Sequence, residues 1–105
     1  MENKLAKFLG YKLNPETKHY EKLTEYGKEI KSAGYFNSHS HTFVDSLLKK
    51  IESYPDLNSM HFDRDDGKWN VRLYLKSTGL IDEASGNTLD ESILNIAKIL
   101  VKQIY

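Results

Sequence analysis

Apolar and polar side chains alternate on both sides of a short turn in the second half of the chain. Residues 59–75 contain two such runs, joined by the turn Asp65-Asp66-Gly67-Lys68. An Asp-Gly pair between alternating segments is typical of a β-hairpin, because the turn needs residues that tolerate positive φ. The second run places Trp69, Val71, Leu73 and Leu75 on one face and Asn70, Arg72 and Tyr74 on the other. The pattern therefore predicts a hairpin with one buried face and one mixed face.

Three further segments carry apolar residues at helical spacing. Residues 2–9 form a short amphipathic stretch that Gly10 is expected to end. A second apolar stripe runs from Phe43 to Tyr54, after the candidate caps Ser38, Ser40 and Thr42 and before Pro55. The last stripe follows a Thr-x-x-Glu capping box at 88–91 and continues to residue 104. Between the hairpin and this helix, residues 77–87 are expected to form a loop, because Gly79, Gly86 and Asn87 interrupt them.

Residues 11–36 leave two interpretations open. Asn14-Pro15, Gly27 and Gly34 interrupt this region, while tyrosines and lysines recur along it. The first interpretation is a long loop with short edge strands at about 19–23 and 28–31. The second is a helix over 16–33, which the Glu and Lys content favours. We prefer the loop with strands, because the apolar residues fit no continuous helical stripe.

These elements predict an α+β domain that spans residues 1–105 as a single unit. The expected architecture is an antiparallel hairpin-based sheet against two long helices, with a short N-terminal helix, in an α-β-α sandwich-like arrangement. The 15 Lys and Arg residues balance 15 Asp and Glu residues, which argues against duplex nucleic acid as a partner. The chain contains no cysteine, and no apolar run approaches the ~20 residues that cross a bilayer. Without a signal-like hydrophobic start, a cytoplasmic location is expected.

The strongest candidate for metal chemistry is His39-Ser40-His41. Two imidazoles two residues apart in an extended chain can point the same way, and His61 and Asp63 could complete a zinc or manganese site, with His19 as a further ligand. The alternative is a solvated capping loop at a helix entrance, which we favour because His-x-His is a common pattern. The acids at 63, 65 and 66 are likewise better explained by turn chemistry than by a cation site.

Aromatic and basic residues indicate a possible binding surface. Tyr20, Tyr26, Tyr35 and Tyr74, with Arg72 and the lysines at 18, 22 and 28, have the composition of a surface that stacks bases and contacts phosphates. The alternative is that these tyrosines fill half-buried positions around a small sheet. Neither a phosphate-binding glycine loop nor a nucleophile motif accompanies them, and no cofactor is expected.

Four sequence features together resemble the phage ABA sandwich domain, a family of small phage and prophage proteins. They are a first helix that runs into Gly10-Tyr11, Phe36-Asn37-Ser38 ahead of the second helix, Trp69-Asn70-Val71 early in a strand, and a last helix capped by Thr88 with Ala97 near its middle. The resemblance implies a fold and a phage or mobile-element origin. It implies no catalytic residues.

Two functions are consistent with these observations. The first is a non-catalytic phage-type accessory protein that binds a protein or a nucleotide-like partner, through residues 20–36 and the mixed hairpin face. The second is a small metal-dependent hydrolase or nuclease that uses His39, His41, His61 and Asp63. We favour the first, because no catalytic motif is present. The sequence predicts neither the identity of the partner nor the oligomeric state.

Overall fold

A computed structural model describes residues 1–38, 40–79 and 81–105, and this part of the chain forms helices and two antiparallel sheets. The helices are α1 (Glu2–Phe8), α2 (His41–Glu52) and α3 (Leu89–Ile104), with a short 3₁₀ helix η1 (Ala33–Asn37). One sheet contains β1 (Lys12–Leu13), β2 (Tyr20–Thr24) and β3 (Gly27–Lys31). The other contains β4 (Leu57–Asp65), β5 (Lys68–Leu75) and β6 (Ile81–Gly86). The predicted α+β class is confirmed.

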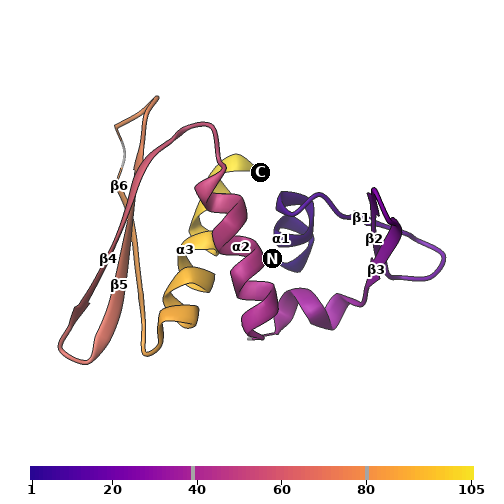
Figure 1. Ribbon diagram of the computed structural model, residues 1–105, viewed down its shortest axis with the longest axis horizontal. Helices are drawn as coiled ribbons and strands as arrows, with labels where there is room; N and C mark the ends of the chain where they lie inside the picture. The colour runs from indigo at the N-terminus through magenta and orange to yellow at the C-terminus, as the bar shows by residue number, and fades with distance from the viewer. Residues whose placement is uncertain (39, 80) are drawn as a thin grey trace.

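The two sheets lie at opposite ends of an elongated molecule of 44 × 31 × 24 Å. The three helices lie between them, so the layers run from the β4–β5–β6 sheet through the helices to the β1–β2–β3 sheet (Figure 1). The longest helix, α3, packs on β5 and β6, and α2 packs beside it with a smaller contact to β4. Helix α1 joins this body to the second sheet.

The predicted hairpin is confirmed as β4 and β5. Its turn residues Asp66 and Gly67 have φ values of 53° and 76°, as a type I′ turn requires. On β5, Val71 and Leu73 are fully buried beneath the helices, which is the predicted face. Trp69 lies on the same face but stays partly exposed. It sits close to the turn, opposite Arg64, whose guanidinium lies 5.9 Å from the ring centre.

The prediction of a loop over residues 77–87 is wrong for most of its length. Residues 81–86 form β6, which pairs antiparallel with β5 so that Val71 lies opposite Ala84 and Trp69 opposite Gly86. The pattern was hard to recognise because β6 is an edge strand with several polar side chains. Gly86 is required there, since a Cβ at this position would lie 2.6 Å from the backbone nitrogen of Ser92 in α3.

Local hydrogen bonds fix the helix ends. Helix α1 ends in a Schellman motif, in which Gly10 has φ of +90° and the N–H of Tyr11 donates to the carbonyl of Ala6 at 2.9 Å. The Ser40 hydroxyl accepts from the Phe43 N–H at 3.3 Å and caps α2, which begins two residues before the predicted apolar stripe. The Thr88 hydroxyl caps α3, as its sequence predicts.

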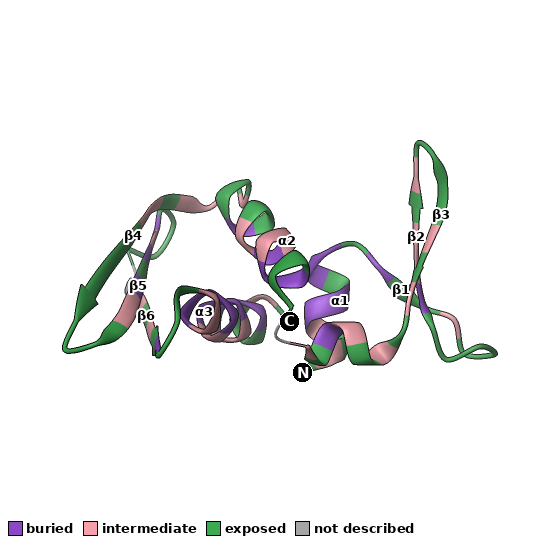
Figure 2. Cartoon of the chain, turned by 60° about the horizontal axis from the view of Figure 1, so that its bottom comes forward, coloured by how far each residue is buried: buried purple, intermediate pink, exposed green. Residues whose placement is uncertain are grey.

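The hydrophobic core lies where the helices face one another and the inner side of β5. Figure 2 shows the buried residues along these facing sides, while the outer faces of both sheets are largely exposed. The core continues through Phe36 and Tyr11 to Tyr20 at the base of β2. Within residues 11–36 the short strands are confirmed, at Tyr20–Thr24 and Gly27–Lys31, and the alternative helix over 16–33 is wrong.

Candidate functional site

The hairpin formed by β2, β3 and their turn, residues 20–31, projects from the end of the molecule (Figures 1 and 2), and we call it the arm. Its turn is held by Thr24, whose hydroxyl donates to the Gly27 carbonyl at 2.8 Å and accepts from the Tyr26 N–H at 3.3 Å. Gly27 has φ of +119°, a conformation that favours glycine. Tyr26 therefore stands at the tip of the arm with 94% of its surface exposed.

The outer face of the arm carries two exposed apolar side chains. Leu23 lies opposite Lys28 and Ile30 lies opposite Glu21, so Leu23 and Ile30 are diagonal neighbours on one face. They are 84% and 56% exposed. An ion pair of 3.6 Å between Lys28 and Glu21 crosses the same face. The ion pair therefore passes between the two apolar side chains, and Tyr26 adds an exposed ring at the tip.

The inner face of the arm is anchored in the core. Tyr20 is only 3% exposed, and its ring meets Phe36 edge-on with centroids 4.9 Å apart. Phe36 meets Phe43 of α2 in the same way at 5.8 Å. The Tyr20 hydroxyl donates a hydrogen bond to Asn3 of α1, and burial raises the pKa of Tyr20. The base of the arm is therefore fixed to two helices, and only its tip and outer face are free.

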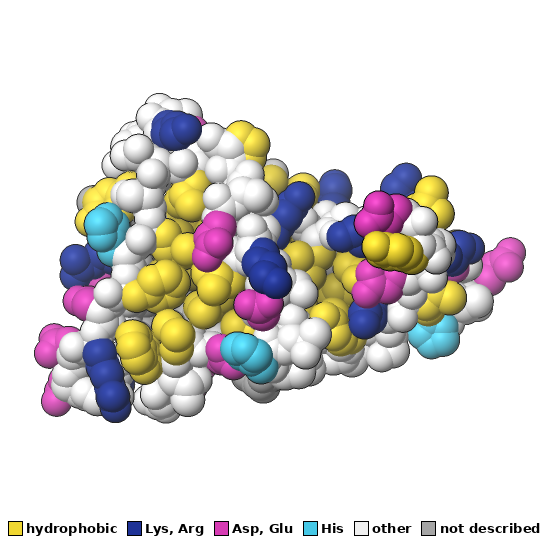
Figure 3. Space-filling view, viewed as in Figure 1, with side chains coloured by type: hydrophobic (Ala, Val, Ile, Leu, Met, Phe, Trp, Pro, Cys, Tyr) yellow, Lys and Arg dark blue, Asp and Glu magenta, His cyan; other side chains and the backbone are white. Residues whose placement is uncertain are grey.

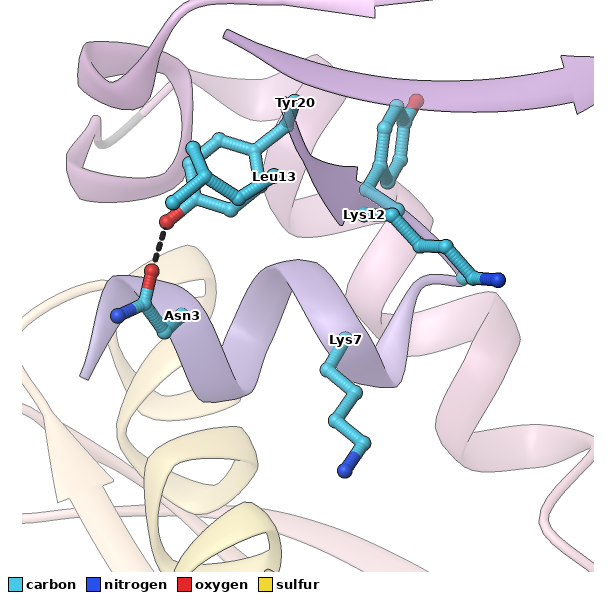
Figure 4. A pocket seen from close by; sticks show the side chains of 7 residues that line it. Asn3, Lys7, Lys12, Leu13 and Tyr20 are labelled. Carbon is cyan, nitrogen blue, oxygen red and sulfur yellow. Dashed lines mark hydrogen bonds between the residues drawn. The ribbon is translucent and has the colours of Figure 1, made fainter. Parts of the chain in front are cut away.

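A pocket of about 410 Å³ lies beside the base of the arm, between α1 and the β1–β2 strands. Figure 4 shows its lining, with the bond between Tyr20 and Asn3 at one end. The lining residues are Asn3, Lys7, Gly10, Tyr11, Lys12, Leu13 and Tyr20. Burial and the nearby Glu29 carboxylate raise the pKa of Tyr11 to about 12, so this phenol stays protonated at neutral pH.

The two lysines of the pocket do not converge on one point. In Figure 4 the Lys7 and Lys12 side chains extend in different directions. The Lys7 ammonium lies 4.7 Å from the centre of the Tyr105 ring at the end of the chain. A phosphate group needs several donors aimed at the same place. The pocket is therefore better suited to an apolar side chain than to a nucleotide.

The five tyrosine and arginine residues predicted as a binding surface do not form a single surface. Tyr20 is in the core, and its ring is not available for stacking. Tyr35 is partly buried and meets Phe36 and Phe43 edge-on, with the Lys31 ammonium 4.6 Å from its ring centre. Only Tyr26 is fully presented by the arm.

Arg72 and Tyr74 lie on the outer face of β5, in the sheet at the opposite end of the molecule. Arg72 lies 3.7 Å from the Glu83 carboxylate of β6. The Tyr74 ring meets the His61 ring edge-on with centroids 5.2 Å apart. These two residues therefore belong to a second surface, separate from the arm.

The histidines predicted as metal ligands occupy different elements. His39 lies outside the described residues. His41, at the start of α2, has its Nδ1 3.0 Å from the Asp90 carboxylate of α3, and this hydrogen bond raises the pKa of the imidazole. His61 lies on β4 and His19 on the exposed connection before β2. Across residues 1–38, 40–79 and 81–105, no three His, Asp or Glu side chains come together as a metal site.

The predicted contact region 20–36 contains Leu23 and Ile30, but the sequence did not single them out as binding residues. Each is a lone apolar residue in a polar segment, and Tyr20 and Leu23 point to opposite faces of the same strand. Sequence reasoning also missed Asn3 and Leu13, which line the pocket from segments that the fold brings together. No sequence signal marks a pocket assembled in this way.

Comparisons with protein-family models, with curated proteins and with solved structures found no match for this chain. Of the helices that the structure describes, none has the length and apolar character to cross a membrane.

Proposed function

We propose that the chain is a non-catalytic accessory protein of phage or prophage type, which acts in the cytoplasm by binding another protein through the arm. The observation that carries this proposal is the simultaneous exposure of Leu23, Tyr26 and Ile30 on one short hairpin. Exposed apolar side chains that lie close together among polar ones are typical of protein–protein contact sites, where tyrosine is enriched. The phage assignment rests on the sequence resemblance alone.

The way the arm is held also supports a binding role. An isolated two-stranded hairpin is marginally stable in water, whereas this one is fixed through Tyr20 and Phe36 to the core. A surface that is already ordered loses less conformational entropy when a partner binds. The divergent Lys7 and Lys12 side chains favour a protein over a nucleotide-like ligand as that partner.

Affinity capture followed by direct binding measurement tests the proposal. The tagged chain is used to capture partners from cells in which it is naturally expressed, and the dissociation constant is then measured with the purified partner. The double substitution Leu23→Ser/Ile30→Ser is expected to weaken binding by about 100-fold, because interface hot-spot residues each contribute on the order of 1–2 kcal/mol. The matched control is Glu52→Ser/Lys76→Ser, which removes two exposed polar side chains outside the arm.

The control is expected to bind like the unmodified chain, and both variants should keep its melting temperature because all four side chains are exposed. Equal binding by Leu23→Ser/Ile30→Ser would show that the arm is not the contact surface. Failure to capture any protein that binds the purified chain would contradict the proposed function itself.

A further inference from the structure

Strand β4 forms an open edge of its sheet. The strand order is β4-β5-β6, so β4 pairs only with β5 among the residues that the structure describes. It is nine residues long, and its side chains from His61 to Asp65 are all exposed. Such an edge is a template for pairing with a strand of another chain. The question is which strand fits it.

The hairpin register fixes which backbone groups of β4 face outward. The two-residue turn makes Asp65 and Lys68 a hydrogen-bonded pair, and hydrogen-bonded and non-hydrogen-bonded pairs alternate along an antiparallel ladder. Asp63 and His61 therefore bond to β5. The N–H and C=O groups of Met60, Phe62 and Arg64 point away from it, toward the open edge.

These groups allow β4 to pair antiparallel with a second copy of itself. When a two-fold axis passes through Phe62, the outward groups of Met60 face those of Arg64 in the second copy, and the two Phe62 residues face each other. In the same register, His61 of each copy lies opposite Asp63 of the other copy on the outer face, which makes two such pairs. Each outer pair joins a carboxylate to an imidazole that can donate to it.

Other registers are less complementary. An axis one residue later sets Asp63 against Asp63, and an axis one residue earlier sets His61 against His61. Of these three registers, only the one centred on Phe62 opposes no identical polar groups. The complementary pair, an imidazole donor facing a carboxylate, selects both the occupant and its alignment.

The apolar side chains near this edge agree with the same register. Phe62 is 38% exposed and lies on the helix-facing side of β4, where Met60 and Leu57 are partly buried. Figure 3 shows hydrophobic side chains gathered on this side of the molecule, between the outer strand and α2. A partner strand with its own Phe62 at the axis covers the ring and removes this surface from water.

We propose that two copies of this chain pair through β4 about a two-fold axis at Phe62, which joins their three-stranded sheets into one six-stranded sheet. The interface belongs to the β4–β5–β6 sheet and leaves both arms free. It is therefore independent of the proposed function of the arm.

Sedimentation equilibrium of the full chain, over a range of concentrations, tests this proposal. The unmodified chain is expected to be a dimer that dissociates on dilution. His61→Asp places a carboxylate opposite Asp63 at two positions and should raise the dissociation constant by at least about tenfold, because like charges across an interface are costly. His61→Asp/Asp63→Lys restores opposite charges and should return the dissociation constant toward its original value. Ser85→Asp adds the same charge to the outer face of β6 and should change nothing.

Amide hydrogen exchange gives an independent measurement of the register. The amides of Met60, Phe62 and Arg64 should gain protection as concentration rises, while the amides of His61 and Asp63 should not change, because they already bond to β5. A chain that stays monomeric at every concentration would overturn the proposal. A dimer whose dissociation constant is the same in His61→Asp and in His61→Asp/Asp63→Lys would overturn it as well. Far-ultraviolet circular dichroism and melting of each variant establish that the fold is intact.

Discussion

Removing the Phe36 ring is expected to destabilise the protein more than most other single substitutions. Phe36 is fully buried and meets the rings of Tyr11, Tyr20, Tyr35 and Phe43, with centroids 4.9–5.8 Å apart. Truncation of a buried Phe to Ala costs on the order of 3–5 kcal/mol, through lost apolar burial and the cavity left behind. A chain of this length has a total stability of roughly 5–15 kcal/mol, so the loss is a large share of it.

Urea unfolding, followed by circular dichroism, measures the effect of Phe36→Ala. Phe36→Leu should cost less, since it keeps much of the apolar volume and loses only the edge-on ring contacts. Tyr26→Ala is the matched control, because it removes an aromatic ring from the same region at an exposed position and should stay within about 0.5 kcal/mol. A loss below about 1 kcal/mol for Phe36→Ala would refute the conclusion that this ring cluster joins the arm to the core.

Three further predictions concern other parts of the fold. Gly86→Ala should lower the free energy of unfolding by about 1–3 kcal/mol, because the added Cβ would lie 2.6 Å from the backbone of α3. Thermal melting measures this loss, and an unchanged melting temperature would contradict the close packing of β6 on α3. Thr88→Ala should cost about 1 kcal/mol in urea unfolding through the lost cap, while Thr88→Ser should not. The hydrogen bond to Asp90 raises the pKa of His41 above its ordinary value of about 6.5. The pair therefore stabilises the fold fully at pH values below the ordinary pKa. This stabilisation is lost as the pH rises through the raised pKa of the folded state. An NMR titration should therefore show a lower His41 pKa in Asp90→Asn, and an equal pKa would exclude the pair in solution.

The sequence predicts the elements whose local signals agree with their packing. The Asp66-Gly67 turn and the alternation beside it specify the β4–β5 hairpin, because positive φ and a period of two point to the same structure. Helices α2 and α3 also begin at capping residues that are visible in the sequence, Ser40 and Thr88. These features depend on residues that are close together in the chain, so the amino-acid sequence is enough to recognise them.

The sequence did not predict β6 or the face that the arm exposes. Strand β6 has Asp82, Glu83 and Ser85 among its residues. In the part of the chain that the structure describes it pairs only with β5, so its strand character comes from β5 and not from its own pattern. In the arm, Tyr20 and Leu23 lie on opposite faces, and only the contact with Phe36 decides which one is buried. Such contacts join residues far apart in the chain and leave no periodic signal.

Helix α1 has seven residues, too few for a helix that is stable by itself in water. It nevertheless contacts both the arm and the end of α3, since Asn3 accepts a hydrogen bond from Tyr20 and Lys7 lies over the ring of Tyr105. Its helical state therefore depends on neighbours that belong to different layers. Opening of α1 would remove the hydrogen bond from Tyr20 to Asn3, while the edge-on contact between Tyr20 and Phe36 would remain. The arm is thus held by one attachment that depends on a short helix and by a second, through Phe36, that belongs to the core.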